Sequence, residues 1–306
     1  AMSGMANAAV ATFLVEAIMS YIAGDLFGIS FFKDVGSIAG GMGGVAAAAL
    51  VPMGMGASPV LSMCAGVAVG GYGILPGFIA GYVVGLIGPA IEKKLPEGLD
   101  VIVGALVVAS VARAIAAFVN PGVTMVLSII GKTITEATLT SPIIMGFLLG
   151  GIIKMICTSP LSSMALTAML GLTGLPMGIA AVACFGGSFT NGTIFKRLHF
   201  GNNGNVIAVM LEPLTQADIV TTHPIPIYGS NFFGGGIAGV GAAMLGIVNN
   251  APGTASPIPG MLAPFAFNAP GKVVMALAIA AVGGGIAGFI GSIVFKKFDE
   301  GVEAVD

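Results

Sequence analysis

Residues 58–63 read Ser-Pro-Val-Leu-Ser-Met, and 101 residues later residues 159–164 read Ser-Pro-Leu-Ser-Ser-Met. A third Ser-Pro step, Ser256-Pro257, follows 97 residues further on. Each step lies in a stretch rich in apolar and small residues, where proline ends a helix and leaves backbone groups without their helical partners. The spacing predicts one broken-helix unit that is written two to three times, with a period near 100 residues.

A pair of cations ends each predicted unit. The pairs are Lys93-Lys94, Lys196-Arg197 and Lys296-Lys297, and they follow the prolines of the Ser-Pro steps by 34, 36 and 39 residues. Lysine and arginine gather on cytoplasmic loops, so three pairs at one place in the unit predict parallel repeats with cytoplasmic basic ends. The expected repeats cover residues 31–98, 138–201 and 229–301, with helices in 100–137 and 204–228 as additions to the first two.

The composition decides the surroundings of these helices. Of the 306 residues 56% are hydrophobic and 8% are charged, and the mean hydropathy is +1.04. A soluble domain carries about 25% charged residues, so most of this chain must face lipid. At about 20 residues per spanning helix, we predict an all-α polytopic membrane protein with about eight to ten spans. The 49 glycines and 17 prolines favour broken or re-entrant helices, which are typical of carriers and channels.

Within the unit, the pattern predicts a long helix, a short helix after the Ser-Pro step, and a second long helix that ends at the cations. The long helices are expected at 36–56 and 75–92, at 141–157 and 174–195, and at 231–249 and 271–295. Further helices are expected at 7–28, 100–119 and 205–220. Parallel repeats need an even number of crossings, so the stretch 121–137 or the Ser-Pro half-helix must also cross.

Several function classes find no support in the sequence. The net charge of −2 offers no basic surface for nucleic acid. Cys64, Cys157 and Cys184 lie in apolar runs without metal or redox spacing, so we expect buried free thiols, no metal site and no cofactor. The glycine runs 40–44 and 234–236 follow no strand, and we expect them to pack helices. The first apolar segment lacks the pattern of a signal peptide and is predicted to be a retained span.

Glu212 is the strongest candidate for a functional side chain. It follows the apolar run 206–211 and precedes Pro213, which frees a backbone carbonyl. An ionisable group at membrane depth is costly and marks a functional site by default. Its carboxylate can accept hydrogen bonds from sugar hydroxyls or hold a proton or sodium ion; alternatively, it caps a helix or pairs with a cation. Thr215 and Gln216 continue the same polar segment, and Glu136 is a second candidate for an ion site.

His223 and the Ser-Pro hydroxyls complete the candidate set. His223 lies between threonines and prolines, which favours an extended segment in which imidazole meets the solute or the interface. Thr158, Ser159 and Ser163 surround the second Ser-Pro step, where half-helix ends would aim N–H groups into the protein; a packed hairpin is the alternative. Asn191 belongs to an Asn-rich stretch near the second cation pair, which suits either a solvated loop or a substrate contact.

Residues 158–175 read Thr-Ser-Pro-Leu-Ser-Ser-Met-Ala-Leu-Thr-Ala-Met-Leu-Gly-Leu-Thr-Gly-Leu. This stretch resembles the Pro-(Leu/Ile)-Ser-Ser-x-Ala-x-x-x-Met-Leu-Gly-Leu-x-Gly segment of PfoR-type EIIC-like membrane proteins. These proteins are classed with the sugar-specific membrane components of the bacterial phosphotransferase system. Small residues follow in that group, and Ala180–Cys184 fits the continuation. The clear likeness covers about residues 140–190.

The resemblance implies a permease domain in the bacterial inner membrane for a sugar or a related polar metabolite. Phosphorylation in such systems is done by separate IIA and IIB domains, so we expect no chemistry in this chain and a cytosolic IIB-type partner. Sugar-transporting EIIC proteins often bind substrate with a Glu-Pro element and a His, to which Glu212-Pro213 and His223 are similar in type. We also expect lipid contacts and a homo-oligomer. Two alternatives stay open: an ion-coupled carrier of a small metabolite, and a membrane sensor.

Overall fold

The structure, a computed structural model, describes residues 1–96, 98–159 and 162–299, and these residues form helices and no strand. The chain divides into two compact units, unit 1 (Ala1–Ile130) and unit 2 (Gly131–Asp306), which are described separately. Parts of the sequence landmarks lie outside the described residues, namely Glu97, Pro160, Leu161, Glu300 and Gly301. The predicted all-α class is confirmed for the part of the chain that the structure describes.

Unit 1 begins with a helical segment made of α1 (Met2–Ala9) and the π-helical stretches η1 (Val10–Leu14) and η2 (Ala17–Leu26). It continues with α2 (Ser30–Gly41), α3 (Gly43–Met53), α4 (Pro59–Ala68) and α5 (Ile74–Lys94). The single helix predicted at 36–56 is wrong, because α2 and α3 are bent by 54° at Met42. The glycine run allows this bend and lets α3 approach the chain before α5, since a Cβ on Gly44 would overlap the Tyr72 carbonyl oxygen.

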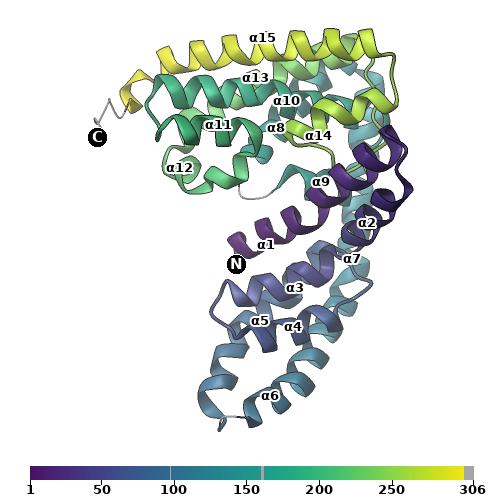
Figure 1. Cartoon of the computed structure of the whole chain (residues 1–306), viewed down its shortest axis with the longest axis vertical. Coiled ribbons are helices and arrows are strands. Elements are labelled where there is room, and N and C mark those ends of the chain that lie inside the picture. The colour runs from purple at the N-terminus through teal and green to yellow at the C-terminus, as the bar shows by residue number, and fades with distance from the viewer. Residues whose placement is uncertain (97, 160–161, 300–306) are drawn as a thin grey trace. The chain divides into compact units, whose positions relative to one another are not determined.

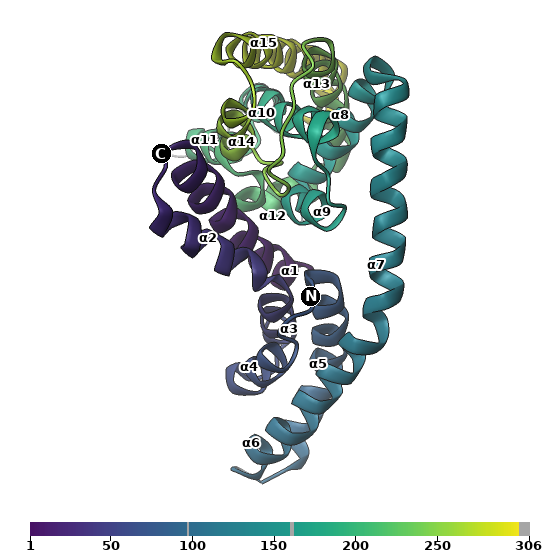
Figure 2. The same ribbon diagram turned by 90° about the vertical axis from the view of Figure 1, so that its right-hand side faces the viewer.

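The last part of unit 1 leads into the longest helix of the chain. It consists of α6 (Leu99–Val103), η3 (Gly104–Val108) and α7 (Ala109–Thr140), which crosses the boundary into unit 2. The sequence predicts a helix at 100–119 and leaves open whether 121–137 crosses separately, but α7 continues through Pro121 as one helix of 32 residues (Figure 2). Proline removes one backbone hydrogen bond, which the apolar helix on either side tolerates in a membrane setting. The stretch 121–137 is therefore not a separate crossing.

Unit 2 repeats an order of long and short helices. Its elements are α8 (Pro142–Thr158), α9 (Ser163–Met169), α10 (Gly174–Arg197), α11 (Asn203–Leu211), η4 (Pro213–Gln216), α12 (Ala217–Thr222), α13 (Pro224–Met244), α14 (Pro257–Leu262), η5 (Ala263–Ala266), α15 (Pro270–Val294) and η6 (Lys296–Phe298). The helix predicted at 205–220 breaks at Glu212, where Pro213 cannot continue it. The predicted extended segment around His223 is also wrong, since α12 ends and α13 begins on either side of it.

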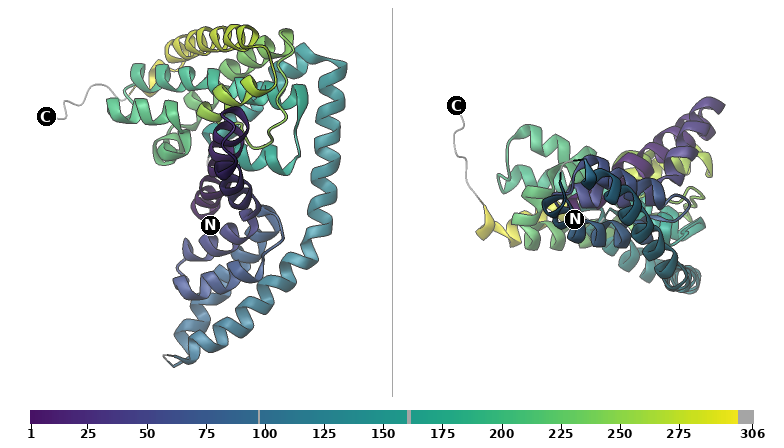
Figure 3. Two further views of the ribbon diagram at one scale, coloured as in Figure 1. Left: turned by 45° about the vertical axis from the view of Figure 1, so that its right-hand side comes forward. Right: turned by 90° about the horizontal axis from the view of Figure 1, so that it is seen from below.

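The core of unit 2 is formed by α8, α10, α13 and α15. Helix α13 packs against α8 and α15, and α10 packs against α15, α13 and α8. Figures 1 and 3 show α15 (yellow) running alongside α13 (green). Glycines permit the closest approach: a Cβ on Gly150 of α8 would lie 3.0 Å from the Gly239 Cα of α13. Gly234–Gly236 all contact neighbouring helices, so the prediction that this run packs helices is confirmed.

Three segments share the predicted element order. They are α3–α4–α5, α8–α9–α10 and α13–α14–α15, each a first helix of 11, 17 or 21 residues, a shorter helix that follows a Ser-Pro step, and a long helix. Helices α5 and α10 end at Lys94 and Arg197, and α15 ends two residues before Lys296. That these segments are parallel copies of one another stays a prediction.

The structure contains helices suited to crossing a membrane. Five candidates meet the length and hydropathy of a span, or six if the bent α2–α3 pair counts as one. Two shorter apolar helices, α4 with 10 residues and α8 with 17, fall below this length, so the number of about eight to ten spans stays a prediction. The glycine and proline breaks shorten several helices, which is why the length criterion alone gives fewer spans than the total apolar content.

Candidate functional site

Buried polar side chains gather inside unit 2, between helices that are otherwise apolar. We call the following residues the polar cluster: Lys154, Cys157, Thr158, Ser163, Cys184, Asn191 and Asn231. Glu212 and Ser256 form the rim of this cluster and are counted with it. All its members except Glu212 are less than 3% exposed. Groups of this kind lose their hydration when they are buried, so the protein must give them partners or use them.

Three helices build the centre of the cluster with pairs of residues four positions apart. Such pairs share one face of a helix and lie one turn apart. Asn191 on α10 donates through Nδ2 to the Thr158 Oγ1 of α8 at 3.4 Å, and Asn231 on α13 donates through Nδ2 to the Asn191 Oδ1 at 2.6 Å. One turn away, Lys154 packs its stem against Gly187 of α10 and Gly235 of α13. The three helices thus form an amide and hydroxyl layer beside a lysine layer.

The amide layer is incompletely satisfied. Asn231 also donates to the Ile227 carbonyl oxygen at 2.9 Å, but its own Oδ1 has no hydrogen-bond partner. The adjacent Ser230 hydroxyl is buried and unpartnered too. A buried acceptor without a donor costs free energy, which a ligand with hydroxyl groups would recover.

Lys154 is completely buried, with 0% exposure. Its Nζ lies 4.0 Å from the Cys157 Sγ, the one atom of the described residues within hydrogen-bonding reach of it. The ion pairs among the described residues are Lys33–Asp25 and His199–Asp299, so no carboxylate lies within 4.0 Å of the Lys154 ammonium. A buried cation without a counter-ion is rare in proteins.

A chain of sulfur and oxygen atoms leads from Lys154 to the start of α9. The Cys157 and Cys184 thiols lie close enough to influence each other. The Cys184 Sγ lies 3.9 Å from the Ser163 Oγ, which donates to the Ala255 carbonyl oxygen at 2.5 Å. The three cysteines are free thiols, as predicted, although Cys64 is only half-buried.

Glu212 stands at the break between α11 and η4, outside the five candidate spans. Its Oε2 accepts a hydrogen bond from the Ser256 hydroxyl at 2.8 Å, and its Oε1 accepts one from the Leu214 N–H at 3.4 Å. Burial raises the pKa of the Glu212 carboxyl, while these hydrogen bonds and the charge of Lys154 act in the opposite direction. Since Ala255 and Ser256 are consecutive, the second and third Ser-Pro segments meet beside Glu212.

The structure brings several predicted site residues together. Thr158, Ser163, Asn191 and Glu212 belong to the polar cluster or its rim. Asn191 lies inside α10 and is buried, which excludes the solvated-loop interpretation for this residue.

Three other predicted residues adjoin the cluster. The Ser159 hydroxyl donates to the Ile156 carbonyl oxygen at 2.8 Å and follows Thr158 directly. On η4, the Thr215 hydroxyl donates to the Glu212 carbonyl oxygen at 2.8 Å, and the Gln216 Oε1 accepts from the Asn205 Nδ2 at 2.7 Å. These contacts hold the polypeptide beside the Glu212 break.

Two predicted residues are placed elsewhere. His223 lies between α12 and α13, where its ring stacks on Phe200 with 4.1 Å between the ring centroids. Phe200 belongs to the apolar group around the C-terminal end of α10, with Phe195 and Leu198. Glu136 is exposed on α7.

Lys154 is the residue that the sequence reasoning missed. It is a lone cation within the apolar run 150–156, five residues before the second Ser-Pro step. The rule that selected Glu212, an ionisable group at membrane depth, selects Lys154 equally. The sequence does not single out Asn231, because a single asparagine in a glycine-rich helix is uncharged. Its contact with Asn191 is known only from the structure.

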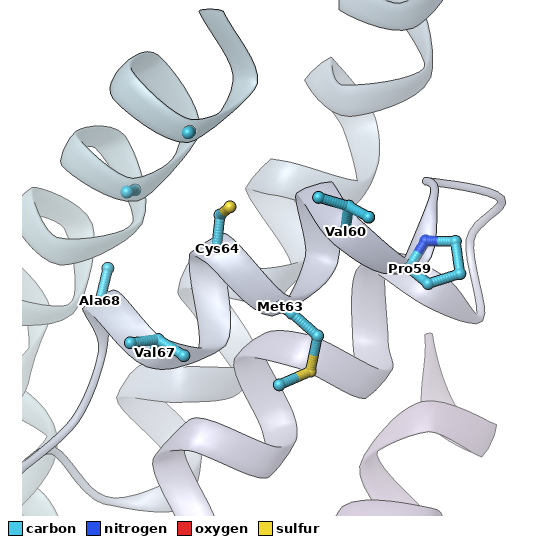
Figure 4. Close-up of a pocket in the computed structure, with 8 residues that line it drawn as sticks. Pro59, Val60, Met63, Cys64, Val67 and Ala68 are labelled. Atoms are coloured by element: carbon cyan, nitrogen blue, oxygen red, sulfur yellow. The ribbon is translucent and has the colours of Figure 1, made fainter. Parts of the chain in front are cut away.

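Unit 1 contains a different kind of recess. A groove of about 670 Å³ runs along α4 and faces η3 and the start of α7 (Figure 4). Its lining residues are Pro59, Val60, Met63, Cys64, Val67, Ala68, Ala105 and Ala109. Apart from the Cys64 thiol this lining is apolar, so it offers no hydrogen bonds to a polar solute.

Apolar helices with breaks that gather buried polar groups define a class: polytopic membrane proteins that move polar solutes. The chain belongs to the EIIC family of the phosphotransferase system, because the family model described as "Phosphotransferase system, EIIC" matches residues 1–303. The resemblance inferred from residues 158–175 is confirmed. The chain is thus a multi-pass membrane component of a sugar-transporting phosphotransferase system, which works with cytosolic components of that system. Comparisons with curated proteins and with solved structures found no match.

Proposed function

We propose that the polar cluster of unit 2 is the solute-binding site of this permease. The observation that carries the proposal is the Thr158–Asn191–Asn231 layer, a buried hydrogen-bonded network that still has an unpartnered oxygen on Asn231. A sugar presents hydroxyl groups that both donate and accept hydrogen bonds. It therefore matches a layer of amides and hydroxyls better than an apolar or metal ligand does.

Each side chain has a role in this proposal. Glu212 accepts hydrogen bonds from solute hydroxyls, while Asn191 and Asn231 donate and accept in the centre of the site. Thr158 and Ser163 line it from α8 and α9, and Ser159, Thr215 and Gln216 shape its edge. His223 and Glu136 have no part in it, because the structure places His223 against Phe200 and Glu136 on an exposed face.

Access to the site requires movement, since its central residues are fully buried. Ser162 before α9, Glu212, and Ser256 before α14 are all outside helices, and these three positions border the cluster. Short helices that end at such breaks can turn while the long helices stay packed. We propose that α9 and α14 open the site to either side in turn.

The wider setting is also part of the proposal. The protein resides in a bacterial inner membrane as a homo-oligomer, with the three cation pairs on the cytoplasmic side. A cytosolic IIB-type protein phosphorylates the solute there. The basic ends of α5 and α10 suit contact with such a protein, because cations near helix C-termini are favoured by the helix dipole and stay exposed.

The second candidate function is a proton-coupled carrier, and the observation that favours it is the raised pKa of Glu212. A carboxyl with this property can take up and release a proton during transport. Uptake into proteoliposomes distinguishes the two: an ionophore that collapses the proton gradient stops a coupled carrier, whereas a phosphotransferase permease needs its cytosolic partner proteins instead.

Removal of the hydroxyl and amide of the central layer tests the site. The double variant Thr158→Ala with Asn191→Ala should weaken binding of the transported sugar by about 100-fold, because each lost hydrogen bond contributes about 1 kcal/mol and Asn231 loses its acceptor. Binding is measured by isothermal titration on the purified protein in nanodiscs. The control is Ser62→Ala in unit 1, which removes a buried, unpartnered hydroxyl. Unchanged affinity in the double variant would overturn the proposed site.

A further inference from the structure

We infer that the solute bound at this site carries a carboxylate, as a sugar acid does, and that the Lys154 ammonium binds it. The inference rests on the proposed solute site and names its substrate class. It starts from Lys154, the one cation within the polar cluster, which has 0% exposure and no carboxylate of residues 1–96, 98–159 or 162–299 within 4.0 Å.

The helices around Lys154 are shaped to hold this side chain. A Cβ on Gly187 would overlap the Lys154 stem, and so would a Cβ on Gly235. Two helices therefore leave out a side chain to make room for one lysine. A buried cation without a counter-ion disfavours folding, and an apolar residue of similar volume would fill the same space without that cost. Its presence is explained by a ligand that supplies the missing negative charge.

The surroundings of the ammonium suit an anion that also bears hydroxyl groups. The neighbours that the described residues give Lys154 are the Cys157 thiol and two glycines, none of which is a carboxylate. One turn away, the Asn231 Oδ1 lacks a partner and can accept a hydrogen bond from a solute hydroxyl. Glu212 is close enough for its titration to respond to Lys154, yet it is held by Ser256 and Leu214 instead.

The two charges can therefore select the two ends of one solute. The carboxylate pairs with Lys154, and the far hydroxyls donate to Glu212. A neutral sugar would leave the ammonium unpaired in a site closed to water. A site built to pair with a buried polar group rejects the analogue that lacks it more strongly than it rejects a small change of shape.

Matched pairs of acids and neutral sugars test this inference. Purified full-length protein in nanodiscs is titrated with D-gluconate against D-glucitol and with D-galacturonate against D-galactose, and binding is followed by thermal shift and calorimetry. We expect at least one acid to bind about 10- to 100-fold more tightly than its neutral partner, the factor of one charged hydrogen bond. In Lys154→Met this preference should vanish, while the control Lys132→Met, an exposed lysine of α7, keeps it.

The Lys154→Met variant also has a stability readout. Without ligand its Tm should equal or exceed that of the wild type, because the variant removes an unpaired buried charge; a lower Tm would indicate a structural lysine and overturn the inference. Lys154→Gln, a second variant without the charge, is measured in parallel and should show the same loss of preference without a lower Tm.

Neutral members that bind as tightly as the acids, in wild type and variant alike, overturn the carboxylate and leave the proposed site standing. Absence of binding by every member of the panel overturns both proposals.

Discussion

The α3–α4–α5 segment of unit 1 and the α8–α9–α10 segment of unit 2 have the same order of helices and different interiors. Counted back from the serine of each Ser-Pro step, Met53 stands where Lys154 does, and Ala57 stands where Thr158 does. Counted back from the first cation, Gly88 stands where Asn191 does.

The last two of these corresponding positions are in contact in both segments, but the residues there are apolar in unit 1 and polar in unit 2. A Cβ on Gly88 would lie 3.3 Å from the Ala57 Cβ, just as Asn191 lies against Thr158 in unit 2. The apolar core of unit 1 contains Ala57, Leu61 and Ala65, whereas the corresponding place in unit 2 is filled with hydrogen-bonding groups.

This difference separates scaffold from site. In unit 1 the Ser58 N–H donates to the Glu92 Oε1 at 3.0 Å. The carboxylate of Glu92, near the end of α5, therefore holds the Ser-Pro step before α4 in place. In unit 2 the Glu212 carboxylate meets the Ser-Pro step of another segment and borders a cluster with unsatisfied groups. The same order of helices is thus apolar inside in unit 1 and polar inside in unit 2. Polar residues at a few positions decide which of the two segments can bind a solute.

The largest effect that sharpens this comparison should come from the two glutamates. Glu212→Gln should weaken solute binding by roughly 100-fold or more, because hydrogen bonds to a charged acceptor contribute about 1.5–3 kcal/mol each. Glu92→Gln should leave affinity unchanged, since its carboxylate serves the fold of unit 1. Calorimetry on both purified variants checks this. Equal losses would mean that the comparison assigns the wrong roles.

A smaller effect is expected from two glycines. Gly187→Ala should weaken binding of the solute about tenfold, because the new Cβ overlaps the Cγ, Cδ and Cε of the buried Lys154 side chain and displaces its ammonium. Gly85→Ala in α5 meets the flexible end of Met55 and should be tolerated. Binding curves and Tm values for both variants separate a local shift from general misfolding. If Gly85→Ala lowered the affinity as much, the lysine layer would not be special.

The smallest effect concerns the pH dependence of stability. Because the pKa of Glu212 is raised in the folded protein, its contribution to stability is fully present below the unfolded pKa and is lost as pH rises through the folded value. The slope from this group is at most about 1.4 kcal/mol per pH unit. The Glu212→Gln variant should lack this pH dependence. Compared with the wild type, it should therefore be more stable at neutral pH than at low pH. Thermal unfolding between pH 4 and 8 measures the difference, and parallel curves would contradict the pKa direction.

Much of the fold could be predicted from local patterns. The second long helix of each of the three predicted repeats was placed to within about two residues at its ends. An apolar run bounded by glycine or proline on one side and a cation pair on the other fixes both ends. The errors arose at breaks. Met42 bends a helix without any proline, and Pro121 fails to end one, since packing decides what a single Gly or Pro does in a buried helix.

The site was predictable in part. Glu212, Ser163 and Thr158 were selected because charge or hydroxyls interrupt apolar runs at proline breaks. Lys154 carried the same signal and was overlooked. His223 had a plausible neighbourhood in the sequence, but its ring is used to stack on Phe200.

The sequence by itself determined that the chain lies in lipid, that it is helical, that its helices are broken at Ser-Pro steps, and that it resembles the EIIC group. These properties follow from composition and short-range pattern, which every segment of chain carries alone. The tertiary structure decided that Lys154, Asn191 and Asn231 meet, and that Glu212 reaches Ser256 of another segment. Such meetings depend on which helix faces pack together, and that is settled by glycine contacts between elements far apart in the sequence.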